Sequence, residues 1–176
     1  MDLVIETERL VMRELRPEDA PGMFTLDSNP KVHQYLGNNP VQSMEQIHGA
    51  IASIRNQYQT KGIGRFAVIL KDSNEFIGWS GLKFITEPEN NHVNFYDLGY
   101  RLQEKYWRKG YALESAMAWL HYGFTQMNIK TMYASAHIDN VGSNAILQKI
   151  GMIQNGHFYW NDLLCNWYEL ENKNFK

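Results

Sequence analysis

Three strand-like segments between residues 65 and 102 restrict the possible folds of this chain more than any other feature. They span residues 65–70, 76–85 and 93–102 and are rich in aliphatic and aromatic side chains. The turns between them, residues 72–74 and 87–90, are short and contain Asp, Ser, Asn and Pro. Because such short connections join neighbouring antiparallel strands, the segments predict an antiparallel meander.

Helical and strand-like patterns lie on both sides of this meander. Residues 9–15 alternate like a strand, Pro17 begins a helix, and Ser43 begins a capping box before an amphipathic helix that reaches Tyr58. Beyond the meander, the pattern predicts helices over 110–126 and 143–150 and strands over 131–137, 154–160 and 163–170. This order is typical of a mixed, layered α/β fold. The sequence contains no repeat or linker, and its length suits a single core, so we predict one domain over residues 1–176.

Composition and charge argue against several classes of function. The formal net charge is −2, and no run of Lys or Arg is long enough to predict nucleic-acid binding. The N-terminal residues resemble neither a signal peptide nor a membrane span, and the single Cys165 cannot form an internal disulfide. These features favour a cytoplasmic protein. The six histidines show no metal-type spacing, so we expect no metal site.

The most informative loop, residues 106–112, lies between a predicted strand and a predicted helix. A helix start offers free backbone N–H groups and a positive dipole end, and both attract phosphate. Gly110 and Ala112 would let a phosphate approach the backbone closely, while Arg108 and Lys109 would add positive charge. Taken alone, however, these residue types favour an ordinary solvated loop in which Gly110 serves only the turn.

In its context this loop resembles the pyrophosphate loop of the GNAT superfamily of N-acetyltransferases, with Gly110 and Ala112 at the small positions. Segments elsewhere are similar to the branch of that superfamily that acetylates the N-termini of ribosomal proteins. These segments are residues 6–13, 97–100, 106–107, 139–143 and 147–152. The resemblance covers nearly the whole chain. It departs at Trp107, where the general pattern has Gln or Arg, and at Met152, where an aromatic residue is usual.

The resemblance implies a GNAT fold and acetyl-CoA as cosubstrate. The fold would have a mixed, mostly antiparallel sheet of six to seven strands, about four flanking helices, and a splay between the fourth and fifth strands. The pantetheine arm would pair with the fourth strand, and the pyrophosphate would lie on the loop backbone. The implied cofactor-binding residues are Leu98, Gly99, Tyr100, Arg101, Leu102, Trp107, Arg108, Lys109, Gly110, Tyr111, Ala112, Asn140 and Ser143.

Two of these residues have alternative explanations in the sequence. Gly99 marks either a close approach of another backbone or a packing position beneath Trp107 or Tyr111. Asn140 either bonds the cofactor arm, as the resemblance implies, or serves a turn.

Acetyl transfer to an amine requires a base, because an amine with a pKa of roughly 8 to 10 is mostly protonated at neutral pH. Asp97 and Asp162 are equal candidates. Asp162 could instead be a turn residue, and Asp97 could be exposed on its strand or pair with Arg101. Ser143 matches a serine of the branch and could protonate the leaving thiolate, or it could cap the short helix.

The resemblance favours an N-terminal Ala or Ser of a protein as the acceptor, with an oxyanion donor from the backbone of residues 98–100. Two alternatives remain open: acetylation of a small amine such as a polyamine or an aminoglycoside, and a module that binds acyl-CoA without turnover. Both a monomer and a homodimer agree with the sequence.

Overall fold

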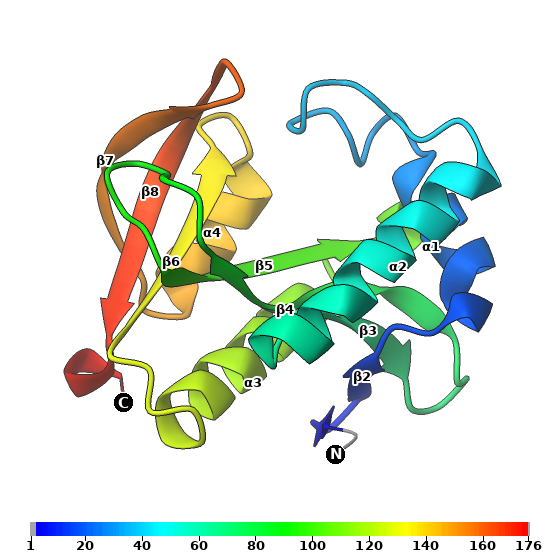
Figure 1. Cartoon of the computed structure of the whole chain (residues 1–176), viewed down its shortest axis with the longest axis horizontal. Helices are drawn as coiled ribbons and strands as arrows, with labels where there is room; N and C mark the ends of the chain where they lie inside the picture. Colours follow the sequence, from blue (N-terminus) through cyan, green and yellow to red (C-terminus); the bar gives the residue numbers. More distant parts are fainter. Residues whose placement is uncertain (1–2, 176) are drawn as a thin grey trace.

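A computed structural model describes residues 3–175, which form one eight-stranded sheet in the order β1-β2-β3-β4-β5-β6-β8-β7 (Figure 1). Every neighbouring pair is antiparallel except β5 and β6, which are parallel. The strands are β1 (Val4–Glu6), β2 (Leu10–Glu14), β3 (Arg65–Leu70), β4 (Phe76–Ile85), β5 (Phe95–Leu102), β6 (Thr131–His137), β7 (Ile153–Trp160) and β8 (Leu163–Glu171). The predicted meander is confirmed as β3, β4 and β5.

The α-helices are α1 (Ala20–Asp27), α2 (Met44–Lys61), α3 (Tyr111–Thr125) and α4 (Val141–Lys149). The predicted fold class, a mixed and mostly antiparallel sheet with about four helices, is confirmed. The sheet has one strand more than predicted, because β1 has only three residues and is too short to show an alternating pattern. Its pairing with β2, from Val4↔Arg13 to Glu6↔Val11, defines it instead.

Local signals account for where the helices begin. Ser43 accepts the N–H of Gln46 and the Gln46 side chain bonds back to Ser43, so α2 begins with the predicted capping box. Pro17 begins a 3₁₀ turn, Pro17–Asp19, that runs directly into α1 at Ala20, so the α-helix itself begins three residues after the predicted start.

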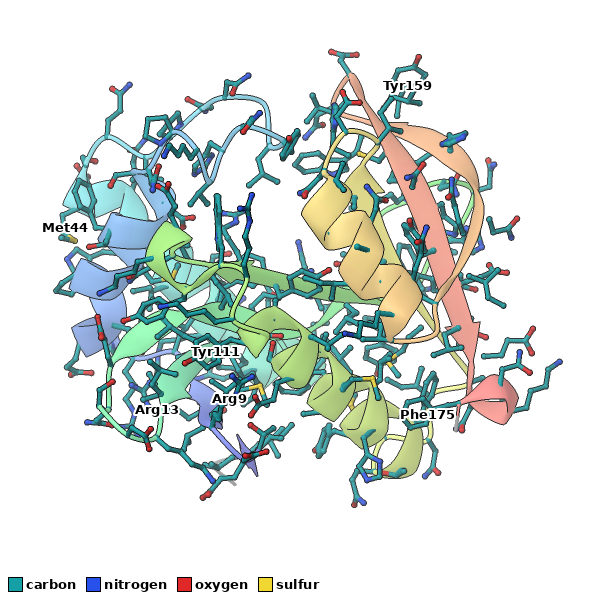
Figure 2. The ribbon with its side chains drawn as sticks, turned by 180° about the vertical axis from the view of Figure 1, so that it is seen from behind. Arg9, Arg13, Met44, Tyr111, Tyr159 and Phe175 are labelled. Atoms are coloured by element: carbon teal, nitrogen blue, oxygen red, sulfur yellow. The ribbon has the colours of Figure 1, made fainter. Side chains whose placement is uncertain are left out.

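The two faces of the sheet are covered by different helices. Helices α1 and α2 cover one face and α3 covers the other, as the front and back views show (Figures 1 and 2). Trp119, Leu120 and Phe124 of α3 pack in a core with Leu82 and Leu98 of the sheet. On the opposite face, residues of α1 and α2 pack against β3: Met23, Leu26, Ile47, Ile51, Ala67 and Ile69. Burial of these apolar faces is the main stabilising contribution.

The feature that positions the site is the divergence of β5 from β6. These strands share only the register pairs Tyr96↔Met132 and Asp97↔Tyr133, whereas β5 stays paired with β4 from Phe95 to Leu102. Figure 1 shows β5 running away from β6 and β8 beyond this point. The predicted splay is therefore confirmed, and it leaves the edge of residues 98–102 without a strand partner among the described residues.

Candidate active site

The open edge of β5 presents a defined set of backbone groups. The N–H of Gln103 donates to the carbonyl of Ile77 at 2.9 Å, and the register with β4 is unbroken. Because hydrogen bonding alternates along an antiparallel strand, Gly99 and Arg101 bond to β4, while Leu98, Tyr100 and Leu102 direct their N–H and C=O groups to the open edge. An extended ligand with amide groups can pair with that edge as an additional strand.

The loop after β5 is fixed against the end of this edge. The indole Nε1 of Trp107 donates to the carbonyl of Leu102 at 2.7 Å. Arg108 and Gly110 have left-handed backbones, with φ of 59° and 84°, and Gly110 is the N-cap of α3. Within residues 3–175, the N–H groups of residues 108–113 have no hydrogen-bond partner. The loop therefore offers a run of free donors at a helix start, where an anion is stabilised.

A pair of hydroxyl groups bridges the two diverging halves of the sheet. The Tyr100 hydroxyl from β5 lies 3.1 Å from the Ser143 Oγ in α4, and it donates to the Ser143 carbonyl at 3.2 Å. Burial raises the pKa of Tyr100, so its phenol stays protonated at neutral pH. Ser143 thus has a hydrogen-bonded hydroxyl partner beside the open edge.

The helix cap at α4 is Asn140 and not Ser143, so the capping role considered for the serine is wrong. The Asn140 side chain accepts the N–H of Ser143 at 3.1 Å, which places Ser143 in the first turn and leaves its hydroxyl free for Tyr100. Helix α4 consequently begins at Val141, two residues earlier than predicted. The neighbouring Asn144 is buried and accepts hydrogen bonds from Asn166 at 2.7 Å and from Tyr168 at 2.8 Å.

Asp97 lies at the last β5–β6 pair, and its partner is Arg65 of β3. The alternative pairing with Arg101 is wrong, because Arg101 pairs with Asp27 of α1 at 2.8 Å. Arg65 also donates to the backbone carbonyl of Asp97 at 2.7 Å. Burial raises the pKa of Asp97 above its usual value, although the Arg65 charge acts in the opposite direction.

Gly99 is approached closely by a side chain, that of Arg65, and not by another backbone. A Cβ built on Gly99 would lie 2.7 Å from a guanidinium nitrogen of Arg65. The packing role beneath Trp107 or Tyr111 is therefore wrong. Any larger residue at this position would displace Arg65, and through it the Arg65–Asp97 ion pair.

The second acidic candidate lies apart from Asp97. Asn161 and Asp162 form the exposed tip of the β7–β8 hairpin with φ of 45° and 64°, so the turn role considered for Asp162 agrees with its geometry. No hydrogen bond or ion pair joins Asp162 to Asp97 among the described residues. Cys165 is buried in an apolar cluster with Phe95, Phe158 and Trp167, where it acts as a packing residue.

Sequence reasoning did not identify Arg65, Arg9 or Glu114 as residues of this region. Arg65 carries no sequence signal, because its role depends on the pairing of β3 with β4 and β5. Arg9 belongs to a segment that the resemblance singled out without a role. It pairs with Glu114 of α3 at 2.6 Å and donates to the carbonyl of Lys109 at 2.9 Å. Glu114 lies in the first turn of α3, directly after the loop of residues 106–112, which we call the phosphate-type loop.

The model of the acetyltransferase (GNAT) domain family matches residues 9–153. The chain belongs to the GNAT family. A curated relative, the uncharacterized N-acetyltransferase YoaA of Bacillus subtilis, is 29% identical over 153 residues, which cover 87% of this chain and 84% of that protein. As a GNAT-family acetyltransferase, the enzyme takes its acetyl group from acetyl-CoA.

Solved structures share the fold of this GNAT chain. A GNAT-family acetyltransferase from Bacillus anthracis is 25% identical, with a TM-score of 0.80 and coverage of 97% of this chain and 99% of that one. The RimL ribosomal α-N-protein acetyltransferase in complex with coenzyme A is 21% identical, with a TM-score of 0.79 and coverage of 96% and 98%.

The open β5 edge and the free loop donors fit two parts of coenzyme A, the pantetheine arm and the diphosphate. The edge suits an amide-containing arm, and the helix start suits a diphosphate. Across residues 3–175, no helix is long and apolar enough to cross a membrane, and no group of His, Cys, Asp and Glu side chains could hold a metal ion.

Proposed function

We propose that this enzyme acetylates the primary amine of a protein N-terminus, with Ala or Ser as the first residue. The resemblance of residues 6–13 and 139–152 to the ribosomal-protein branch supports this acceptor. The likeness in fold to the RimL acetyltransferase along 96% of the chain is compatible with it.

We assign cofactor binding to the open edge and the loop. The backbone of Leu98 and Tyr100 and the N–H of Leu102 pair with the pantetheine arm, because the Leu102 carbonyl already accepts the Trp107 indole N–H. The N–H groups between Arg108 and Ala112 hold the diphosphate. Leu98 and Leu102 contribute only backbone groups, because their side chains are buried in the core beneath α3. The Arg101 backbone bonds to β4 and its side chain bonds Asp27, so we leave Arg101 out of the cofactor-binding set.

The reaction requires two proton transfers around one substitution at carbon. Acetyl-CoA supplies an acetyl thioester. The amine nitrogen bonds to the thioester carbonyl carbon, a backbone N–H of β5 stabilises the oxyanion, and the carbon–sulfur bond then breaks. Asp97 accepts the proton lost by the amine and later releases it to solvent. The Ser143 hydroxyl gives a proton to the leaving thiolate and regains one from solvent through the Tyr100 hydroxyl.

The observation that carries the proposed transfer to an amine is the position of its base, Asp97, at the point where β5 and β6 diverge. It is a largely buried carboxylate next to the free edge, whereas Asp162 lies in an exposed turn. Its raised pKa suits a group that must accept a proton near neutral pH. We therefore favour Asp97 over Asp162 as the base.

A thiol-release assay with acetyl-CoA tests the acceptor. The panel contains peptides that begin with Ala or Ser, the same peptides with a blocked N-terminus, a polyamine and an aminoglycoside. We expect turnover with the free peptides and none with the blocked ones. Faster turnover with a small amine than with every peptide would replace the protein N-terminus by a small-molecule acceptor.

A further inference from the structure

The segment Thr7–Arg9 reaches across to the start of α3 and bonds there to one carboxylate. The Thr7 hydroxyl donates to Glu114 Oε1 at 2.5 Å, and the Arg9 backbone N–H donates to the same oxygen at 2.9 Å. The Arg9 Nε donates to Glu114 Oε2 at 2.6 Å. Three donors from the N-terminal segment therefore satisfy the only acid in the first turn of α3.

The remaining part of the Arg9 guanidinium contacts the phosphate-type loop itself. Its Nη1 donates to the Lys109 carbonyl at 2.9 Å, and its Cζ lies 4.5 Å from the centre of the Tyr111 ring. Its Nη2 lies 3.1 Å from where a Cβ on Gly110 would be. Figure 2 shows Arg9 beside Tyr111 at the start of α3. A tether to α3 alone would need only the Glu114 contact.

The contact with Lys109 determines where the next donor points. The Lys109 carbonyl and the Gly110 N–H belong to one planar trans peptide, so they point in opposite directions. When Arg9 holds the carbonyl, the Gly110 N–H must point away from Arg9. Arg9 also neutralises Glu114, whose charge would otherwise oppose an anion at this helix start.

We propose that Arg9 is a positioning residue for diphosphate recognition: it fixes the Lys109–Gly110 peptide in the orientation that donates to the diphosphate of coenzyme A, and it neutralises Glu114. This inference rests on the phosphate role proposed above for residues 108–112. It gives a function to the segment Thr7–Arg9, to which the family resemblance assigned no role.

Binding of three ligands by the Arg9→Ala variant tests the proposal without any acceptor. CoA and dephospho-CoA both contain the diphosphate, while pantetheine contains only the arm. Because Arg9 makes charge-assisted hydrogen bonds, we expect the Kd for CoA and for dephospho-CoA to rise about tenfold by calorimetry. The Kd for pantetheine, measured by NMR titration, should change less than about twofold. An equal loss for all three ligands, or a loss for CoA alone, would overturn the proposal.

Three further variants separate geometry from charge and from folding. Arg9→Lys keeps the charge but has one nitrogen in place of the separate Nε and Nη1 that bond Glu114 and Lys109, so it should resemble Arg9→Ala. Full recovery of CoA affinity would contradict the geometric role. Arg13→Ala removes a bidentate pair with Asp19 at 2.8 Å, also on the N-terminal part of the chain, and should leave the ratio of CoA to pantetheine affinity unchanged. If Arg9→Ala does not fold, Thr7→Val replaces it as a milder test. This variant should raise the Kd for CoA by a smaller factor than that expected for Arg9→Ala.

The wild-type protein distinguishes this inference from the proposal on which it rests. If wild-type affinity for CoA does not exceed that for pantetheine, the loop does not bind the diphosphate, and the phosphate role fails first. If the wild type prefers CoA and Arg9→Ala keeps the whole preference, only the role of Arg9 fails.

Discussion

The hydroxyl pair of Tyr100 and Ser143 makes the two residues act as one unit. We expect Ser143→Ala to lower kcat about a hundredfold, since loss of a general acid commonly has effects of this order. The KM for acetyl-CoA should change less than about threefold, because the loop and the β5 edge remain. Steady-state thiol release with an accepted amine measures both quantities.

The double variant checks that Tyr100 acts through Ser143. Tyr100→Phe should lower kcat by a smaller factor, and adding it to Ser143→Ala should lower kcat no further. Losses that simply multiply would mean that the two hydroxyl groups act separately.

The ionisation of Asp97 should appear in the pH dependence of activity. Burial raises the pKa of Asp97 and Arg65 opposes that rise, so the carboxylate takes up a proton as the pH falls through its raised pKa and then cannot act as a base. The acceptor amine is protonated in the same direction. At low pH, the slope of log(kcat/KM) should therefore approach 2 for the wild type and about 1 for Asp97→Asn. Circular dichroism at each pH checks that both proteins stay folded, and a slope of 2 in the variant would exclude Asp97.

At the scale of elements, the contact between the N-terminal segment and α3 should depend on pH in a known direction. Burial acts to raise the pKa of Glu114, but the hydrogen bonds from Thr7 and Arg9 outweigh it and lower that pKa below 4.5. A lowered pKa in the folded state stabilises the protein above pH 4.5, and that contribution is lost as the pH falls through the folded-state pKa.

The variant Glu114→Gln measures this contribution. Its free energy of unfolding should be about 1 kcal/mol below that of the wild type at pH 7, because charge-assisted bonds are lost from a mostly buried carboxylate. The difference should shrink toward zero well below pH 4.5. Denaturant unfolding at pH 7 and at the lowest pH at which both proteins stay folded gives the two values, and a difference independent of pH would contradict the role of the charge.

Local sequence signals determined much of the fold but little of the pairing between side chains. The box at Ser43 and the short turns between residues 65 and 102 depend on neighbouring residues, so they could be read directly. The start of α4 was placed too late because Asn140 and Ser143 are both good capping residues, and only the backbone shows which one caps. The partner of Asp97 was missed because Arg65 is 32 residues away and reaches it only through the pairing of three strands.

On the scale of the whole molecule, the sheet consists of two parts with a narrow junction. Strands β1 to β5 form one part and β6 to β8 the other, joined in the sheet by the two β5–β6 pairs. The Tyr100–Ser143 contact adds a second link near the open edge. The resemblance could predict the splay, but the hydroxyl link became visible only when β5 and α4 were placed together.

A ligand whose arm lies between these two parts should suppress their movement apart. Local opening at a boundary with few strand pairs exposes backbone amides to exchange, and a ligand that binds only the closed form slows it. With CoA at about 100 times its Kd, we expect the amide of Tyr133 at the β5–β6 junction to exchange at least about tenfold more slowly by NMR. The Tyr100 amide on the open edge should also slow, because it bonds the arm directly. The Gly99 amide, which already bonds to β4, should change least. Adenosine 3′,5′-bisphosphate at equal saturation is the control, because it contains phosphates but no arm, and it should leave Tyr133 unaffected. Equal slowing by both ligands would mean that phosphate binding alone joins the two parts, and the arm would then have no part in holding β5 and β6 together.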